Sequence, residues 1–321
     1  MKIKFRLWIK VALPVILIGI IAYWLWWWQT DPHSGLYNKG EGEDPALVGV
    51  IEGTRQGSLK GAMGVALDVN GNLYVANGET NTVVVLNRKG KLLRTIGKDG
   101  QGRNLLKFPT SVAISPKGQV YVANFGGGGV LVFDTQGRLQ DRLPLAKDRT
   151  LVKELKPLAL AADSEGNIYA ADGEQHKVFV FDAQGSLKLA FGGKGSGKNQ
   201  FSFINGLVVD EKNRRLIIVD SNNLRLSMYN YLGRLIRHVS YKEKGANLLV
   251  APRGIAWNPA KDELYVADAL KDSILVLKDD GRLISEFGYK SLNYPIDIAR
   301  DEEGYLYVTN RERNRISVFK Q

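Results

Sequence analysis

The 321-residue chain contains no cysteine and three histidines. Without cysteine it has neither disulfides nor a thiolate metal site. The absence does not identify a compartment, because a closed core of this size is stable without cross-links. The histidines, His33, His176 and His238, fall at unrelated places: a linker, a repeat position and an expected outer strand. This spread argues against a metal site built from three histidines.

Acidic residues are missing from the first 30 positions, which carry the basic residues Lys2, Lys4, Arg6 and Lys10. The run 11–28 has no charge and ends in several tryptophans. It is long enough to cross a hydrocarbon core of about 30 Å, and aromatic rings favour the membrane interface. A cleaved signal peptide would have a shorter apolar core followed by small residues. We therefore expect an uncleaved transmembrane anchor at 11–28, with segment 1–10 in the cytoplasm and the remainder outside the membrane.

The net charge of +11 leaves +7 for the rest of the chain, after the four positive charges of the first 30 residues are subtracted. In a cytoplasmic protein this excess would suggest nucleic acid. Outside the membrane, anionic glycans, wall polymers and lipid head groups are the more available partners. General solubility is the alternative explanation of the charge.

One sequence unit recurs six times at a spacing of about 47 residues. Its clearest copies are 64–77, 160–172 and 254–268. The first unit predicts four short strands, at 64–69, 72–77, 82–87 and 91–96, separated by Asn-Gly and Lys-Gly turns. Four antiparallel strands per repeat are typical of a propeller blade, whose neighbours must stack to bury its apolar faces. Segment 29–45, rich in glycine and proline, is expected to be a linker.

The last repeat, Pro295 to Lys320, ends after three strands. Segment 47–53 resembles 91–97, the outer strand of the first unit, and precedes the same kind of loop. We therefore predict that 47–53 completes the last blade and closes the ring, which removes open sheet edges. Residues 46–321 are expected to form one all-β, six-bladed propeller.

The unit resembles the NHL repeat, whose pattern is Pro-x-Gly-Ile-Ala-Val-Asp, Gly-Asn-Val-Tyr-Val-Ala-Asp, Asn-His-Arg-Ile and Phe-Gly. Matching stretches are 251–256, 166–172, 175–178 and 287–288, whereas the last copy departs at the third element with Arg313-Asn314-Arg315-Ile316. The resemblance implies a six-bladed NHL-type propeller. It says little about activity, because such repeats occur in scaffolds, sensors, RNA-binding proteins and some enzymes. The scattered histidines argue against the zinc-dependent amidating lyases that share the repeat.

Two motifs look functional but fit the repeat. Residues 192–198, Gly-Gly-Lys-Gly-Ser-Gly-Lys, have the spacing of a phosphate-binding loop. Asn199 follows in place of Ser or Thr, and the next segment predicts a strand and not the helix that would hold phosphate. Aspartates recur at fixed repeat positions, where they are expected to accept backbone N–H groups in turns. A divalent cation in the central channel, as in propellers resembling gluconolactonases, is the alternative for these carboxylates.

The loops between blades, and those between second and third strands, define what we call the long-loop face of the ring. These loops are rich in basic residues, and loops on a rigid scaffold commonly carry function. Aromatic residues are interspersed, several of which must pack between blades: Phe108, Phe125, Phe201, Phe203, Tyr241 and Tyr294. A solvated basic face without a ligand is the alternative. We predict binding through Lys98, Arg103, Lys107, Lys194, Lys198, Arg253, Lys271, Arg311 and Arg313.

We therefore expect a membrane-tethered extracytoplasmic binding or scaffold module that engages a partner protein or an anionic polysaccharide. No cofactor and no nucleic acid partner are expected. The alternative is a lactonase-like hydrolase or lyase that depends on a divalent cation in the channel. No pairing of a nucleophile with a base is visible in the sequence.

Overall fold

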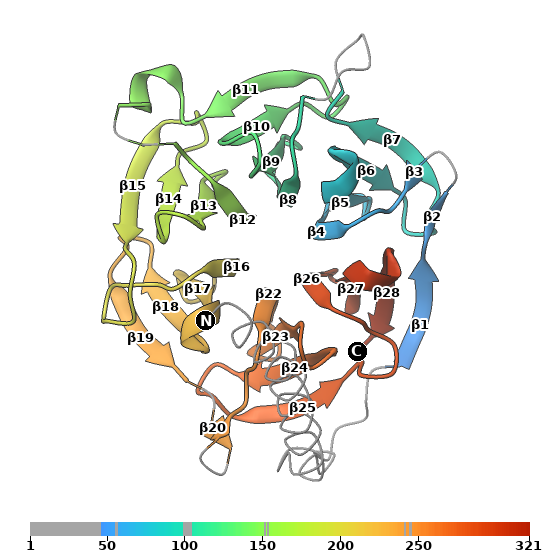
Figure 1. The fold of residues 1–321 in the computed structure, drawn as a ribbon, viewed down its shortest axis with the longest axis vertical. Helices are drawn as coiled ribbons and strands as arrows, with labels where there is room; N and C mark the ends of the chain where they lie inside the picture. Colours follow the sequence, from blue (N-terminus) through green and yellow to red (C-terminus); the bar gives the residue numbers. More distant parts are fainter. Residues whose placement is uncertain are drawn as a thin grey trace, which may run out of the picture. The chain divides into compact units, whose positions relative to one another are not determined.

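The computed structural model describes residues 46–54, 57–98, 105–150, 152, 154–240, 242–243 and 246–321. The described residues form six four-stranded antiparallel sheets. Figure 1 shows them arranged radially, with the strand that begins each repeat unit innermost. The fold is therefore an all-β, six-bladed propeller. The predicted basic segment, anchor and linker (1–45) lie outside the described residues, within which no helix has the length and apolarity to span a membrane.

The first three blades follow one another along the chain. Blade 1 is β4(Ala62–Leu67), β5(Leu73–Asn77), β6(Thr82–Leu86) and β7(Leu92–Ile96); blade 2 is β8(Pro109–Ile114), β9(Val120–Asn124), β10(Val130–Phe133) and β11(Leu139–Leu143). Blade 3 is β12(Pro157–Ala162), β13(Ile168–Asp172), β14(Lys177–Phe181) and β15(Leu187–Gly192).

The last three blades complete the ring. Blade 4 is β16(Ile204–Asp210), β17(Arg215–Asp220), β18(Arg225–Asn230) and β19(Leu235–Val239); blade 5 is β22(Pro252–Asn258), β23(Glu263–Asp268), β24(Ser273–Lys278) and β25(Leu283–Phe287). Blade 6 is β26(Pro295–Arg300), β27(Tyr305–Asn310), β28(Arg315–Lys320) and β1(Ala46–Ile51). Two short pairs accompany the blades: β2(Gly53–Thr54) with β3(Gly57–Ser58), and β20(Lys242–Glu243) with β21(Ala246–Asn247).

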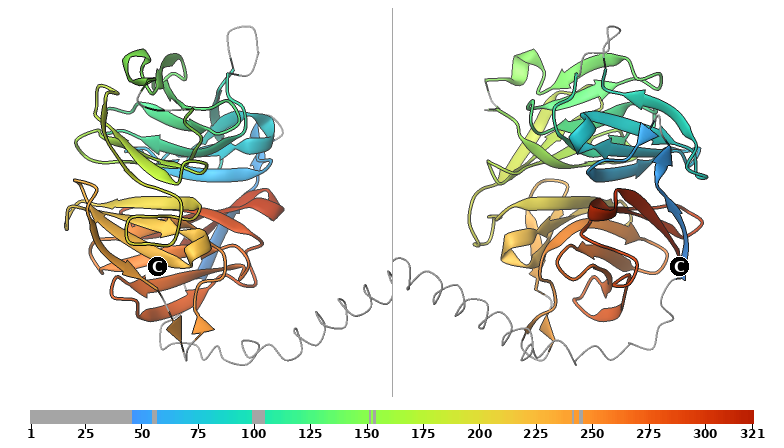
Figure 2. Two further views of the ribbon diagram at one scale, coloured as in Figure 1. Left: turned by 60° about the vertical axis from the view of Figure 1, so that its left-hand side comes forward. Right: turned by 45° about the vertical axis from the view of Figure 1, so that its right-hand side comes forward.

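The N-terminal strand closes the ring. β1 pairs antiparallel with β28, from Ala46 opposite Lys320 to Ile51 opposite Ile316. Figure 2 shows β1, in blue, beside the red strands of blade 6. The two ends of the propeller are thereby hydrogen-bonded within one blade, which is the pairing that the incomplete last repeat predicts.

Apolar packing joins each blade to the next. Six hydrophobic clusters of described residues occur, one at each blade–blade boundary. The cluster between blades 6 and 1, for example, contains Ile316 and Val318 together with Val65, Val75 and Ile51. This is the shared burial that a stacked repeat requires.

The first strand of blade 1 begins and ends two residues before the predicted 64–69. The reason lies in the turn, because the Asp68 carboxylate accepts the backbone N–H groups of Asn70 and Asn72 at 2.9 Å each. Val69 is 91% exposed, which a position in the half-buried strand would not allow. Asp68 and Val69 therefore belong to the hairpin, where a short acidic side chain competes well for backbone donors.

Candidate functional site

Acidic and amide residues at the ends of the second strands accept hydrogen bonds from the loops that lead into the innermost strand of the same blade. Asn77 accepts from Lys60 N (2.6 Å), Asp172 from Lys156 N (2.7 Å) and Asp268 from Val250 N (2.7 Å) and Ala251 N (2.9 Å). The equivalent residues Asn124, Asp220 and Asn310 accept from Lys107, Ser202 and Asn293.

The repeat aspartates predicted to bond backbone donors therefore do so. No group of three or more His, Asp or Glu in the described parts of the chain is placed to hold a metal ion.

A second set of side chains positions the residue just before four of the innermost strands. Asn81 accepts from Phe108 N at 2.7 Å, His176 Nδ1 from Phe203 N at 3.0 Å, and Asp272 from Tyr294 N at 2.7 Å. At blade 1 the pair is Asn314 Oδ1 and Gly61 N, at 2.8 Å. Each bond crosses from one blade to the next, so it also fixes where the following innermost strand begins.

Three of these positioned residues are aromatic and have positive φ. The φ angles are 47° at Phe108, 65° at Phe203 and 57° at Tyr294, against 63° at Gly61. For a bulky residue this conformation is an outlier that costs on the order of 1–3 kcal/mol. Phe108 and Tyr294 also precede prolines, whose rings disfavour helical backbone before them. The backbone at these sites would suit glycine, as it does at blade 1.

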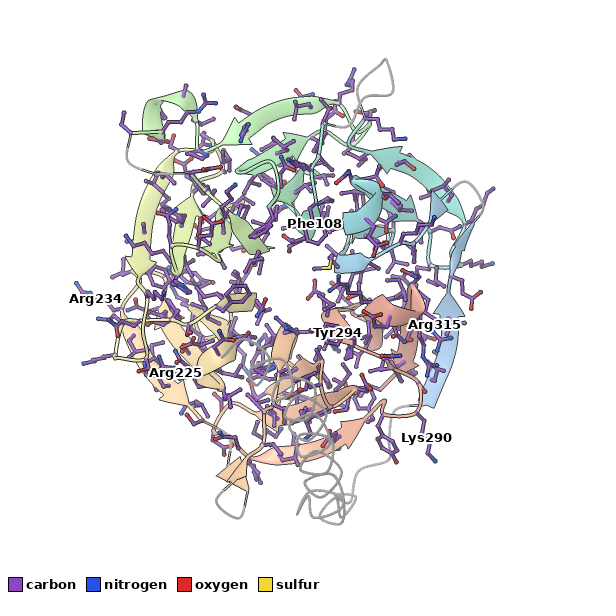
Figure 3. The ribbon with its side chains drawn as sticks, viewed as in Figure 1. Phe108, Arg225, Arg234, Lys290, Tyr294 and Arg315 are labelled. Carbon is purple, nitrogen blue, oxygen red and sulfur yellow. The ribbon has the colours of Figure 1, made fainter. Side chains whose placement is uncertain are left out.

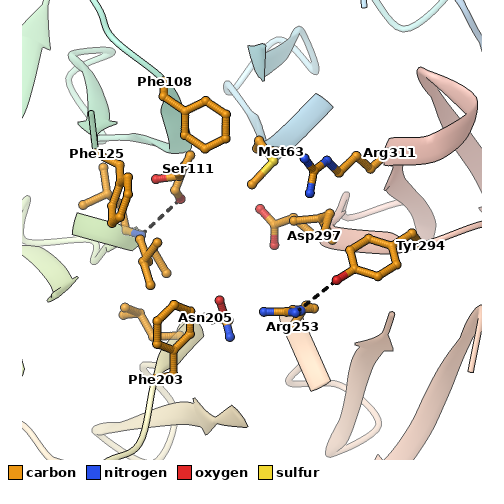
Figure 4. A pocket seen from close by; sticks show the side chains of 17 residues that line it. Met63, Phe108, Ser111, Phe125, Phe203, Asn205, Arg253, Tyr294, Asp297 and Arg311 are labelled. Carbon is orange, nitrogen blue, oxygen red and sulfur yellow. Dashed lines mark hydrogen bonds between the residues drawn. The ribbon is translucent and has the colours of Figure 1, made fainter. Parts of the chain in front are cut away.

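The three aromatic residues surround a cavity of about 240 Å³ on the long-loop side of the ring axis. Figure 3 places Phe108 and Tyr294 at the inner edge of the ring, whereas Arg234 and Lys290 lie at its periphery. Figure 4 shows Phe108, Phe125, Phe203 and Tyr294 around the opening. The cavity combines an apolar rim with polar side chains from several blades, among them Ser111, Asn205, Arg253, Asp297 and Arg311.

Two arginines reach this cavity from different blades. Arg253 lies in β22, and Arg311 begins the short turn η4(Arg311–Arg313) that follows β27. Arg253 Nη2 donates to the Tyr294 hydroxyl at 3.2 Å, and its guanidinium carbon lies 6.0 Å from the centre of that ring. Its Nε is buried without a hydrogen-bond partner. Within the described residues, the Arg311 side chain has neither a hydrogen-bond nor an ion-pair partner.

Among the described residues, Asp297 is the one carboxylate on the cavity wall. Its oxygens accept from Val65 N of blade 1 at 3.1 Å and from Ile298 N at 2.9 Å, so it links blade 6 to blade 1. Burial raises the pKa of Asp297 to about 7, and the two backbone donors lower it only in part. Asp297 is therefore only partly ionised near neutral pH, and the two guanidiniums make the cavity electropositive.

Asp297 occupies a repeat position at which neighbouring innermost strands come close together. Gly64, Gly206 and Gly254 occupy the same position of other innermost strands, and a Cβ on Gly254 would lie 2.4 Å from Asp297 Oδ1. Ser111 makes a comparable bridge between blades 2 and 3, accepting from Leu160 N at 3.1 Å. Where the glycines let two neighbouring innermost strands come into close contact, Asp297 instead joins its strand to the next one through a side-chain hydrogen bond.

The nine predicted basic residues separate into groups. Arg253 and Arg311 line the cavity, and Arg103 lies outside the described residues. Lys271 is engaged within the protein: its Nζ forms an ion pair with Glu286 at 3.1 Å and donates to the Leu248 carbonyl at 3.3 Å. Five side chains are exposed and form no ion pair with a described residue: Lys98, Lys107, Lys194, Lys198 and Arg313.

The predicted aromatic residues also divide. Phe201 is fully buried in the cluster between blades 3 and 4 and is a core residue. Tyr241 lies outside the described residues. Asp297, Ser111 and Asn205 were not among the residues predicted. The signal for Asp297 is its place in the repeat, where three other innermost strands carry glycine.

The glycine-rich segment 192–198 presents backbone carbonyl groups, whereas a phosphate loop presents backbone N–H groups. Two of its carbonyls point at a cation, because Arg225 donates to Ser196 O at 2.9 Å and to Gly197 O at 3.3 Å, as it does to the nearby Gln200 O at 2.9 Å. A phosphate loop presents N–H groups to its ligand and leads into a helix. This segment leads instead into β16, as the sequence predicts.

The two described histidines have structural contacts. His176 holds Phe203 as described above, and His238 hydrogen-bonds Ser227 Oγ at 2.9 Å and the Lys198 carbonyl at 3.0 Å. Burial lowers the pKa of His238. Neither residue lines the cavity at the channel mouth.

Comparison with known proteins agrees with the fold. A family described as a 6-bladed beta-propeller, DUF5128, matches residues 143–241, and no curated protein matches the chain. A streptogramin B lyase structure superposes with a TM-score of 0.61 at 15% identity, covering 85% of this chain and 86% of that one. Virginiamycin B lyase from Staphylococcus aureus gives 0.57 at 15% identity, covering 82% and 85%. Hydrazine synthase from Kuenenia stuttgartiensis gives 0.58 at 14% identity, covering 86% and 99%. At these identities the likeness concerns the fold alone.

Proposed function

We propose that this chain is a membrane-tethered, extracytoplasmic binding propeller whose long-loop face holds an anionic envelope polymer. The observation that carries the proposal is a set of exposed cations on that face that form no ion pair with a described residue, Lys98, Lys107, Lys194, Lys198 and Arg313, outside a cavity with its own two arginines. Unpaired surface cations attract a polyanion through many weak, screened contacts.

The kind of cation favours a polymer over a protein partner. Four of the five exposed cations are lysines, and lysine is depleted from protein–protein interfaces relative to the rest of the surface. Exposed acids also lie on this face, at Glu79, Glu174 and Glu312, so the positive field is interrupted. A flexible polyanion can follow such a pattern more easily than a rigid protein surface.

The binding test uses the full chain on immobilised polygalacturonate. We expect retention at low salt that falls steeply as salt rises. Lys194→Glu combined with Lys198→Glu should weaken retention, because it reverses two exposed charges on one loop of the long-loop face. The matched control, Lys89→Glu with Lys117→Glu, makes the same charge change in hairpin turns of the opposite face. No retention even at low salt, or equal losses for both pairs, would refute the proposal.

We also infer that the propeller is of the NHL type and that 11–28 anchors it with the N-terminus in the cytoplasm. The repeat motifs support the first inference, and the uncharged run with its basic N-terminal flank supports the second. The absence of cysteine makes a clean test available. A membrane-impermeant maleimide should label Gly193→Cys but not Lys4→Cys in intact cells, and the reverse pattern would overturn the topology.

A further inference from the structure

Three aromatic rings occupy one repeat position in alternate blades, around the cavity at the channel mouth. Phe108, Phe203 and Tyr294 directly precede the innermost strands of blades 2, 4 and 6. Gly61 stands at this position in blade 1 with the same sign of φ, which glycine adopts without strain. The ring fold thus does not require side chains there. The positive φ belongs to the repeat, so the strain at Phe108, Phe203 and Tyr294 comes from placing an aromatic residue where glycine fits. Strained residues of this kind cluster at ligand sites.

The rings offer flat apolar surface to a ligand. Phe203 is 37% exposed, and Phe108, Phe125 and Tyr294 stand on other sides of the same cavity. An aromatic face carries partial negative charge, so it attracts the weakly positive C–H groups of a ring packed against it. The apolar face of a sugar ring presents such C–H groups.

The arginines define the charge of the ligand. Arg253 has a buried Nε without an acceptor, and the Arg311 side chain has no partner among the described residues. A guanidinium binds a carboxylate through two parallel hydrogen bonds. Against these two cations, the described residues that line the cavity include a single carboxylate, Asp297. The balance excludes a quaternary ammonium ligand, which the aromatic rings alone would also suit.

The volume of the cavity and its remaining polar groups further limit which ligands fit. A volume of about 240 Å³ is below the usual range for drug-sized ligands and suits a single ring. Asn205 uses its Nδ2 to donate to Ser221 Oγ at 2.7 Å, which leaves its carbonyl oxygen to accept from a hydroxyl. Ser111 Oγ accepts from Leu160 N and retains its own proton to donate.

From these contacts we infer that the cavity binds one carboxylate-bearing sugar ring, of the uronic acid type, from the anionic polymer. The aromatic residues pack on the ring faces, Arg253 and Arg311 hold the carboxylate, and Asn205 and Ser111 meet hydroxyl groups. The inference rests on the proposed function, since it names the unit of the polymer that the long-loop face retains.

The test is calorimetric titration of the full chain with tetragalacturonate and with its methyl ester, which keeps the rings and removes the charge. Binding of the acid and not of the ester is expected. Arg253→Gln should weaken binding of the acid about 10- to 100-fold, the loss of a charge-assisted hydrogen bond. Phe203→Gly should weaken it about 10-fold, as loss of a stacked ring does. Leu224→Gly is the matched control, because Leu224 also has positive φ (49°) but does not line the cavity, and it should bind within twofold of the native chain.

Several results would overturn the inference. The ester could bind as tightly as the acid, or Phe203→Gly could bind as tightly as Leu224→Gly. An oligoglutamate peptide of equal charge could bind as well as tetragalacturonate, which would show that charge and not the sugar ring is recognised. If polygalacturonate retention responds to the Lys194 and Lys198 reversals but not to Arg253→Gln or Phe203→Gly, the proposed function stands and the cavity assignment falls. If the native chain is not retained at all, both fall.

Discussion

Arg225, the first residue of β18, holds the loop 193–203 that connects blade 3 to blade 4, which we call the crossover. Its Nε donates to the Asp220 carboxylate at 2.8 Å, and Asp220 is fully buried. Its terminal nitrogens donate to the Ser196 and Gln200 carbonyls at 2.9 Å each. Arg225→Met keeps much of the apolar length of the side chain but leaves a buried carboxylate without its cation.

The expected loss follows from that geometry. Removing one partner of a buried ion pair costs about 3–5 kcal/mol, because the other charge is left uncompensated. Asp220 would keep Ser202 N (2.7 Å) and Asn223 Nδ2 (2.8 Å) as donors, which favours the lower end. A loss of about 3 kcal/mol corresponds to a fall in Tm of roughly 6–12 °C for a domain of this size. Thermal and urea unfolding of the full chain at pH 7, followed by circular dichroism, measure both quantities.

A second variant distinguishes the ion pair from simple loss of packing. Arg225→Met combined with Asp220→Asn removes both charges and keeps an acceptor for Ser202 N, so part of the lost stability should return. A single-variant loss below about 1 kcal/mol, or a double variant less stable than the sum of the two single ones, would show that the crossover does not depend on this pair. Since the crossover carries Lys194 and Lys198, faster amide exchange in 193–200 should accompany the loss.

Three further predictions concern the ring itself. Gly254→Ala places a Cβ 2.5 Å from Asp297 Cα, and in urea titrations it should lower the free energy of unfolding by about 1–3 kcal/mol. Gly193→Ala is the control, because its Cβ would have no atom within 4 Å, and it should change the free energy of unfolding by less than about 0.5 kcal/mol. The pKa of Asp297 is raised from 3.8 to about 7, so the destabilising effect of its ionisation is absent below pH 4, grows as pH rises and is complete above pH 7. Asparagine keeps one of the two acceptors used by Val65 N and Ile298 N, so the change in Tm caused by Asp297→Asn should be more favourable at pH 8 than at pH 4. Ile51→Ala, at a buried position of the closing strand, should cost about 2–4 kcal/mol in denaturant unfolding, and Leu47→Ala, at a 41% exposed position of that strand, much less.

Much of the fold follows from local pattern. Asp68 and its counterparts precede glycine turns because a short acceptor side chain satisfies the turn donors, and that preference is readable from neighbouring residues. The missing fourth strand of the last repeat predicts the role of β1, because β28 would otherwise be left as an unpaired sheet edge. The absence of a helix after the glycine-rich segment 192–198 excludes a phosphate loop for the same local reason.

The candidate site depends on contacts that no local pattern encodes. Lys271 and Arg311 both look like surface cations in sequence, yet Lys271 is held by Glu286 and Arg311 reaches the channel mouth. Arg253 and Arg311 belong to different blades, and only the angle between blades brings them to one cavity with Asp297. The strain at Phe108 is equally invisible in sequence, since its positive φ accompanies a hydrogen bond that its N–H donates to Asn81 Oδ1 in the preceding blade.

The sequence by itself determined the number of blades, their strand order and the closure by β1, because a repeat that cannot bury its own apolar faces has to stack and then close. The tertiary structure decided which cations are free, which carboxylate faces the channel and which rings surround it. Those properties depend on distances between residues of different blades, and such distances exist only once the ring has closed.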